Sequence, residues 1–138
     1  MKKTKGFTLI ELLVVVGLIS LLTSIVLINL INSRNKARDI AIIIHMNQLA
    51  VIAEEWHGEH GNYAAFCNYS KTKIIFDAVS SVKKYIFCHA DSDQWVACAQ
   101  LNTFNVRDKA WCIDNSLIRK QIDQTDCKEN IKFCPTAE

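Results

Sequence analysis

The hydrophobic residues of this chain are concentrated in one long run near the amino terminus. The run begins at Phe7, ends at Ile31 and contains a single charged residue, Glu11. As a helix, its 25 residues would extend roughly 37 Å, enough to cross a hydrocarbon core of about 30 Å. The pattern therefore predicts a membrane-spanning helix over residues 7–31.

A second hydrophobic pattern follows this run and has the period of a helix. Residues 33–56 contain neither proline nor glycine, and apolar side chains recur at steps of three and four. These side chains are Ile42, Met46, Leu49, Ala53 and Trp56. Gly58 and Gly61 are the first helix-stop signals. We expect one helix over residues 7–57 with its second half against a globular head; a bend near residues 29–35 is the alternative.

Two later segments have the composition that is typical of strands. Residues 94–101 and 110–114 are rich in strand formers, and the segment between them supplies two asparagines and an aspartate for a turn. A hairpin centred near residue 105 would place Cys98 opposite Cys112, within reach of a cross-strand bond.

The other elements give weaker signals. Residues 73–87 are compatible with a short helix, and residues 117–122 with a third strand, whereas residues 62–92 as a whole are hard to interpret. The predicted fold class is α+β, in which a long amino-terminal helix packs on a small antiparallel β-sheet head that carries disulfides.

The charge inside the apolar run needs an explanation. A carboxylate at the centre of a spanning helix costs about 2.5–3.5 kcal/mol on insertion scales, and less near the interface. A simple anchor gains nothing from Glu11, so we expect it to have a function and a partner. Lys2, Lys3 and Lys5 precede the run, and the positive-inside rule places them in the cytoplasm with the rest of the chain outside. A cleaved secretory signal fits poorly, because no small-residue cleavage site closes the run.

Residues 5–12 read KGFTLIEL and resemble the processing site of type IV pilins and their pseudopilin relatives. The resemblance implies cleavage by a prepilin peptidase between Gly6 and Phe7, and methylation of the new amino terminus on Phe7. It also implies that Glu11 neutralises the amino terminus of a neighbouring subunit during assembly. Opposite charges attract strongly in a bundle of low dielectric, and each charge alone would be costly there.

The resemblance also implies a domain plan and a location. Residues 1–6 would be a cytoplasmic leader peptide, residues 7–31 a transmembrane and filament-core helix, and residues 32–138 an extracytoplasmic head that includes the second half of the helix. The chain would be a single-pass protein of the cytoplasmic (inner) membrane. Its assembled form would be an extracellular or cell-surface pilus, or periplasmic if the chain is a pseudopilin.

The chain departs from the family in two places. Many pilins carry a proline about 21 residues after the processed phenylalanine, which corresponds here to Ile28, but the only proline is Pro135. Many relatives also end the helix with Gly-x-Tyr-Pro, whereas residues 61–64 here read GNYA. Without the first proline, the helix has no obvious point for a kink or for local melting.

The net charge restricts the class of partner. The chain has 138 residues with a formal charge of +2, from 16 basic and 14 acidic side chains. Removal of a leader with three lysines leaves 13 basic against 14 acidic residues. Such a balance argues against a strongly basic nucleic-acid binder, and no specific nucleic-acid partner is predicted.

All the cysteines lie after the apolar run, on the side expected to be exported. There are six of them, at positions 67, 88, 98, 112, 127 and 134, and six cysteines allow about 15 pairings. An even number on this side predicts disulfides. We favour Cys67–Cys88, Cys98–Cys112 and Cys127–Cys134; the second rests on the expected hairpin and the third closes a short loop. No C-x-x-C is present and the spacings do not fit zinc, so no metal site is predicted.

Catalytic and ligand-binding patterns are weak. The histidines are His45, His57, His60 and His89. His57 and His60 have a spacing that suits a metal, but we favour a polar surface at the end of the helix. A thiol nucleophile at Cys88, beside His89, would be removed by a disulfide. We predict no enzyme activity and no cofactor.

Two further short patterns resemble functional motifs but are more simply explained as surface polar residues. Residues 91–93 (DSD) resemble the calcium-binding region of some pseudopilin heads, but the complete calcium loop is missing, so solvated acids are favoured. Residues 68–70 (NYS) match the glycosylation sequon with weak specificity.

The favoured function is that of a structural subunit of a type IV pilus filament. Its partners would be further copies or other pilins, a prepilin peptidase, an inner-membrane pilus assembly platform and the membrane. One alternative is a pseudopilin of a type II secretion or competence (DNA-uptake) system. An alternative of another class is an uncleaved, membrane-anchored redox or binding domain. The Gly6–Phe7 junction argues against an uncleaved helix, and the lack of C-x-x-C argues against redox work.

Overall fold

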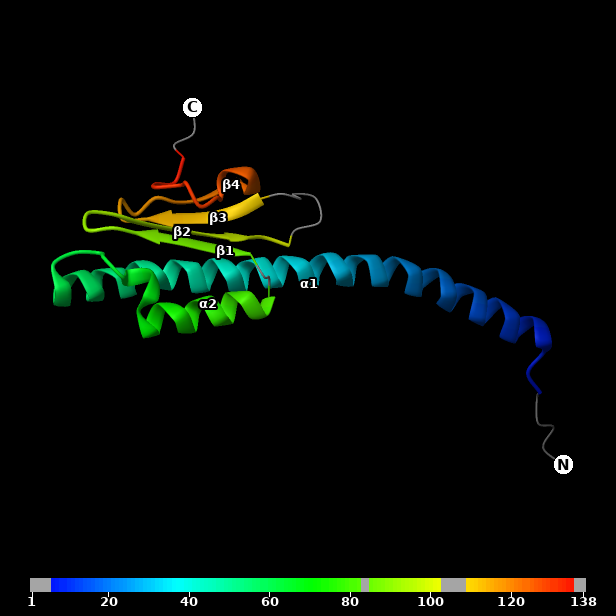
Figure 1. Cartoon of the computed structure of the whole chain (residues 1–138). Helices are drawn as coiled ribbons and strands as arrows, with labels where there is room; N and C mark the ends of the chain where they lie inside the picture. The colour runs from blue at the N-terminus through cyan, green and yellow to red at the C-terminus, as the bar shows by residue number, and fades with distance from the viewer. Residues whose placement is uncertain (1–5, 83–84, 103–108, 136–138) are drawn as a thin grey trace. The chain divides into compact units, whose positions relative to one another are not determined.

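The computed structural model describes residues 6–82, 85–102 and 109–135 (Figure 1). The chain divides into two compact units, Met1–Arg34 and Asn35–Glu138, which are described separately below. The α+β class is confirmed, because a long helix, a second helix, an antiparallel sheet and three disulfides are present. In chain order the elements are α1 (Leu9–His60), η1 (Phe66–Asn68), α2 (Ser70–Val82), β1 (Ile86–Ala90), β2 (Trp95–Gln100), β3 (Lys109–Asp114), β4 (Arg119–Asp123) and η2 (Gln124–Asp126).

The first unit contains the apolar part of α1. Every side chain from residue 6 to residue 34 is exposed within the chain. Helix α1 is long and apolar enough to cross a membrane, with a mean hydropathy of 2.6 in its most apolar window. The hydroxyls of Ser20, Thr23 and Ser24 each donate to the carbonyl four residues earlier, at 2.8–3.0 Å. These polar groups are therefore satisfied inside the helix, as a lipid environment requires.

The second unit contains the rest of α1, which forms one wall of the head. The predicted apolar stripe is confirmed, because Ile42, Met46, Leu49 and Ala53 are buried and Trp56 packs partly buried beside them. The backbone stays helical through residues 29–35, so the alternative with a break there is not observed. The helix ends at His60, three residues later than expected. Gly61 follows with a φ of 71°, a left-handed conformation that glycine adopts without strain.

The sheet is an antiparallel meander in the order β1-β2-β3-β4. The predicted hairpin register is confirmed, because Cys98 is the direct partner of Cys112 in the β2–β3 pairing. Its turn was expected at residues 102–109, of which residues 103–108 lie outside the described residues. The expected third strand corresponds to β4.

The helix expected over residues 73–87 is too long at its carboxyl end. Helix α2 ends at Val82, and residues 86 and 87 belong to β1, which the sequence did not indicate. Strand β1 pairs along its whole length with β2, so this pairing overrides the weak local helical pattern.

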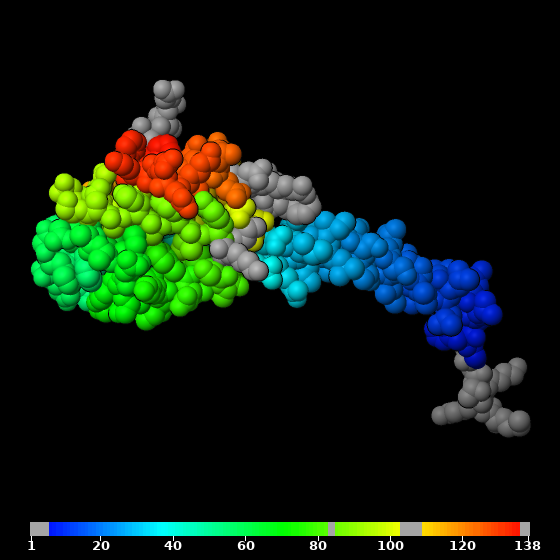
Figure 2. Space-filling model, in the orientation of Figure 1, coloured from blue at the N-terminus to red at the C-terminus, as the bar shows by residue number. Residues whose placement is uncertain are grey.

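The two faces of the sheet are covered by different parts of the chain. One face packs against α1 and α2 through Trp95, Ala97, Ala99 and Ile113. The other, here called the outer face, forms a separate cluster. Its buried members are Val96, Cys98, Ala110, Cys112, Ile122, Cys127 and Cys134. The segment after β4 lies over this face (orange to red in Figures 1 and 2), so side chains that alternate along β2 and β3 are buried on both sides.

Candidate assembly site and the disulfide-linked head

The amino-terminal motif starts with a glycine that the isolated chain does not need. A Cβ built on Gly6 meets nothing within 4 Å. The φ angle of Gly6 is also outside the left-handed region. Among the described glycines, only Gly61 has a left-handed φ. Neither sterics nor conformation therefore requires glycine at this position. The next residue, Phe7, is 81% exposed, so the Gly6–Phe7 bond is accessible to an enzyme.

Thr8 and Glu11 form a reciprocal cap at the start of α1. Glu11 Oε2 accepts hydrogen bonds from the Thr8 backbone N–H at 2.9 Å and from the Thr8 hydroxyl at 2.7 Å. The Glu11 backbone N–H in turn donates to Thr8 Oγ1 at 3.4 Å. This arrangement is a capping box, and its T-x-x-E signature is visible in the sequence. Glu11 thus has a role within its own helix, in addition to the expected role between subunits.

The cap leaves half of the Glu11 carboxylate available. Among the described residues Oε1 accepts no hydrogen bond, and the side chain borders a mostly apolar hollow. The hollow is lined by Phe7, Ile10, Glu11, Val14 and Val15. An exposed acid beside an apolar hollow is suited to an apolar partner that carries one positive charge.

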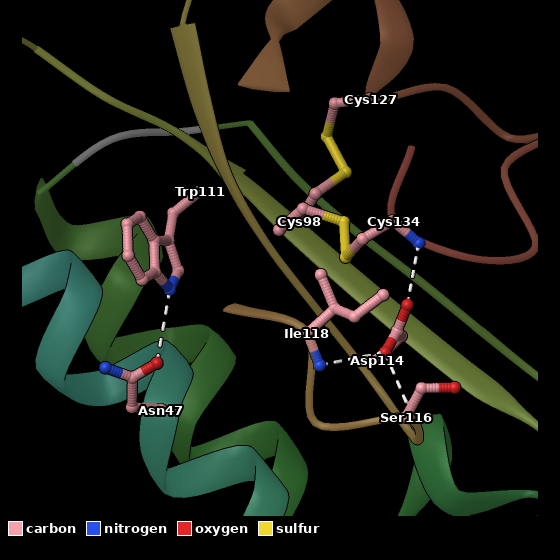
Figure 3. The surroundings of a disulfide bond; sticks show 9 residues. Asn47, Cys98, Trp111, Asp114, Ser116, Ile118, Cys127 and Cys134 are labelled. Carbon is pink, nitrogen blue, oxygen red and sulfur yellow. Dashed lines mark hydrogen bonds between the residues drawn. A yellow bond between two sulfur atoms is a disulfide. The ribbon is translucent and has the colours of Figure 1, made fainter. Parts of the chain in front are cut away.

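The head is closed by three disulfides, and two of them differ from the expected pairs. Cys67 is joined to Cys88, the pairing that we favoured. The expected Cys98–Cys112 and Cys127–Cys134 bonds are wrong, because the structure contains Cys98–Cys127 and Cys112–Cys134 instead. Both strand cysteines lie in the cluster of the outer face, where the carboxyl-terminal segment supplies a partner for each. Figure 3 shows the Cys98–Cys127 bond.

A buried aspartate holds this segment in place. Asp114 is fully buried at the end of β3, and its carboxylate accepts three backbone N–H bonds. Oδ1 accepts from Ser116 at 3.0 Å and Ile118 at 3.2 Å, and Oδ2 accepts from Cys134 at 2.9 Å (Figure 3). The bonds compensate the buried charge and tie the β3–β4 turn to the carboxyl-terminal segment.

Other polar contacts join distant parts of the head. Trp111 Nε1 donates to Asn47 Oδ1 at 3.2 Å, which links β3 to α1 (Figure 3). The Tyr85 hydroxyl donates to the Cys127 carbonyl at 2.7 Å. The backbone N–H of Asn102 donates to Asp39, a buried acid on α1. These contacts fix α1, the sheet and the carboxyl-terminal segment relative to one another within the second unit.

The candidate histidines take part in aromatic packing. His60 stacks on Trp56 with ring centroids 3.7 Å apart, and His57 lies 4.7 Å from Tyr63. Nδ1 of His60 is 3.0 Å from the Trp56 carbonyl oxygen. His45 lies half-buried on α1. Among the described residues no group of three metal-binding side chains occurs.

The acidic DSD segment forms the turn between β1 and β2. Asp91 Oδ1 accepts from the backbone N–H groups of Asp93 at 2.9 Å and Gln94 at 3.0 Å. The bond from Asp93 is the main reason why the pKa of Asp91 lies below its ordinary value. His89 Nε2 is 3.9 Å from Asp91 Oδ2 and lowers that pKa slightly further. Asn68, in the glycosylation sequon, is exposed at the end of η1.

Comparison with known proteins agrees with the amino-terminal motif. Residues 1–27 match the family model for the prokaryotic N-terminal methylation motif. The type IV wide pilus major component PilA4 of Thermus thermophilus is 32% identical over 65 residues, which cover 47% of this chain and 50% of that protein. The chain therefore carries the amino-terminal methylation motif and is similar over about half of its length to a type IV pilin. The chain spans about half the length of the curated relative that it matches, and no solved structure matched it.

The amino-terminal motif and the geometry of α1 agree on how the chain is anchored. The methylation motif and the exposed apolar helix fit a membrane anchor at the amino terminus. The fold, with a long amino-terminal helix, a four-stranded antiparallel sheet and three disulfides, is type IV pilin-like.

Proposed function

We propose that this chain is a type IV pilin and a structural subunit of a type IV pilus filament. A prepilin peptidase cleaves the leader between Gly6 and Phe7, and the new amino terminus on Phe7 is methylated. The processed subunits then polymerise through the helix of residues 7–31, drawn from the membrane by an assembly platform. That the matched relative is a major pilus component favours a pilus over a secretion pseudopilin.

The observation that carries the proposal is the position of Glu11 on an otherwise apolar and fully exposed surface. Helices that leave lipid for a filament core exchange one apolar environment for another, so burial alone gives little driving force. A charge pair between Glu11 of one subunit and the amino terminus of its neighbour supplies both attraction and register. Oε1 of Glu11 accepts no hydrogen bond from the described residues and can therefore accept one from the neighbour's amine. The apolar hollow beside it can receive the neighbour's apolar side chains.

Processing is tested by the mass and the amino-terminal sequence of the protein recovered from its host. We expect loss of residues 1–6 and one added methyl group on Phe7. Gly6→Val should keep the full leader. The matched control is Gly17→Ala, because Gly17 also has open space around it and should be processed normally. Normal shortening of Gly6→Val would refute the proposed cleavage.

A further inference from the structure

Cys98 and Cys112 occupy a special kind of position in the β2–β3 ladder. The Leu101 N–H donates to the Lys109 carbonyl, and the Asn115 N–H donates to the Trp95 carbonyl, which marks both pairs as hydrogen-bonded. The two kinds of pair alternate along an antiparallel ladder, so the Cys98–Cys112 pair is non-hydrogen-bonded. In such pairs the Cα atoms approach to about 4.5 Å, within the range that a disulfide spans.

The two cysteines therefore face a choice of partners. Both point to the outer face, and their observed partners lie with Cα atoms 5.9 Å from Cys98 and 5.8 Å from Cys112. A Cys98–Cys112 bond would need no change in strand register, because the two residues are already opposite each other. The same four sulfur atoms can thus be joined in more than one way on one sheet.

We propose that the outer face is a disulfide-exchange site. A transient Cys98–Cys112 bond forms first, a dithiol isomerase outside the cytoplasm moves it to Cys98–Cys127, and a protein disulfide then oxidises Cys112 and Cys134 to form the second final bond. Among the bonds that Cys98 and Cys112 can form on this face, the first joins residues 14 positions apart, whereas the final bonds join residues 29 and 22 positions apart. Short loops close at a smaller entropic cost, and hairpins form before distant segments dock. The proposal requires an oxidising compartment that holds a dithiol isomerase and a protein disulfide, and it does not depend on filament assembly.

The first bond forms when the Cys98 and Cys112 thiols lose two electrons and two protons to a protein disulfide, which is reduced to its dithiol. A thiolate of the isomerase attacks the Cys98 sulfur, breaks the Cys98–Cys112 bond and releases Cys112 as a thiolate that takes up a proton. The Cys127 thiolate then attacks Cys98 and displaces the isomerase thiolate, which leaves the enzyme unchanged. The Cys112 and Cys134 thiols finally lose two electrons and two protons to a protein disulfide, which is reduced to its dithiol.

The structure accounts for the direction of this exchange. Docking of the carboxyl-terminal segment adds the bond from Cys134 to Asp114 and the bond from Tyr85 to the Cys127 carbonyl. It also buries the four cysteines, each at most 1% exposed. An external thiol cannot then reach the sulfur atoms, so exchange stops once the segment is in place.

The test is a time course of oxidative refolding of the full-length chain in detergent. The reduced chain is placed in a glutathione buffer, samples are quenched by alkylation, and cross-linked peptides are measured by mass spectrometry. Lys109, Lys120 and Lys132 are tryptic sites that separate Cys98, Cys112, Cys127 and Cys134 from one another. Cleavage before Asp91 separates Cys88 from Cys98. We expect the Cys98–Cys112 peptide to reach its maximum before either final pair and then to decline, roughly tenfold faster with catalytic isomerase.

A pair of variants tests the geometry separately. In the double variant Cys127→Ser/Cys134→Ser, Cys98 and Cys112 should be joined to each other in most of the folded molecules. The matched control is Cys67→Ser/Cys88→Ser, which should keep the Cys98–Cys127 and Cys112–Cys134 bonds. A Cys98–Cys112 peptide that never exceeds other non-native pairs during wild-type refolding would overturn the proposal, even if the double variant does not fold. Free thiols at both positions in a folded double variant would overturn it as well.

Discussion

The backbone N–H of Cys134 donates a hydrogen bond to Oδ2 of Asp114 at 2.9 Å, deep in the outer face of the sheet. Asp114 lies two residues after Cys112 on the same strand, and Cys134 is the residue bonded to Cys112. One residue is therefore held by both a disulfide and a hydrogen bond. The carboxylate positions Cys134 above its partner and satisfies a backbone donor that would otherwise be buried unpaired.

Asp114→Asn should destabilise the head by about 2–3 kcal/mol, because the amide cannot accept from all three N–H groups and one nitrogen would face a donor. Thermal unfolding of the full chain in detergent, with the disulfides intact, measures the change. Asp126→Asn is the control, since Asp126 is exposed and should alter stability little. Equal melting temperatures for Asp114→Asn and the wild type would contradict a role for this carboxylate in stability.

The contact between Trp111 and Asn47 should couple the sheet to α1. We expect an interaction energy of about 1 kcal/mol from a double-mutant cycle of Trp111→Phe and Asn47→Ala, the usual net value of a hydrogen bond. Denaturant unfolding of the two single variants and the double variant provides the measurement. Strictly additive effects would show that the bond contributes nothing beyond the packing of the ring.

Glu11→Gln should distinguish the role of the Glu11 charge from its role in capping α1. Glutamine can still accept from Thr8 through its amide oxygen, so the start of α1 should be preserved. We expect normal leader cleavage but a fall in sheared filament of at least about tenfold, because the neutral side chain leaves the neighbour's amine unpaired. Thr8→Ser, which keeps the cap, should assemble like the wild type. Wild-type filament yield from Glu11→Gln would remove the argument for charge pairing.

The turn at Asp91 should weaken in acid. Hydrogen bonds from Asp93 and Gln94 hold its pKa below the ordinary value of 3.8, because they stabilise the charged form. The folded state therefore gains stability from this group above that value and loses it as the pH falls through the lowered pKa. NMR titration should give a midpoint for Asp91 below 3.8. In Asp91→Asn the amide oxygen can keep the turn bonds, and that part of the acid sensitivity should disappear; an unshifted Asp91 midpoint would contradict the argument.

Local patterns predicted much of this fold. The apolar run and the stripe from Ile42 to Trp56 have strong periodicity, so α1 could be located to within a few residues of its ends. The β2–β3 register also followed from local signals, because a turn-rich segment between two strands fixes which residues face each other. The cap formed by Thr8 and Glu11 is also a local feature, because its T-x-x-E signature lies within four consecutive residues.

What the sequence did not reveal depends on contacts between distant residues. Strand β1 has little strand pattern of its own and is specified by pairing with β2. The partners of Cys98 and Cys112 depend on where residues 124–135 lie, and that segment contains few apolar residues to indicate a buried face. The prediction that Cys98 and Cys112 lie opposite each other was correct. Their position in the sheet does not determine the disulfides, because Cys127 and Cys134 compete for the same sulfur atoms.

The arrangement of the last two disulfides has a consequence for durability outside the cell. The loop between Cys127 and Cys134 carries Lys128 and Lys132 on the surface, where secreted proteases cut. After a cut at either lysine, the upstream piece stays anchored through Cys98 and the downstream piece through Cys112. A subunit cut at one of these lysines would therefore keep its carboxyl-terminal segment over the sheet. A filament built from such subunits would stay intact after this kind of cleavage.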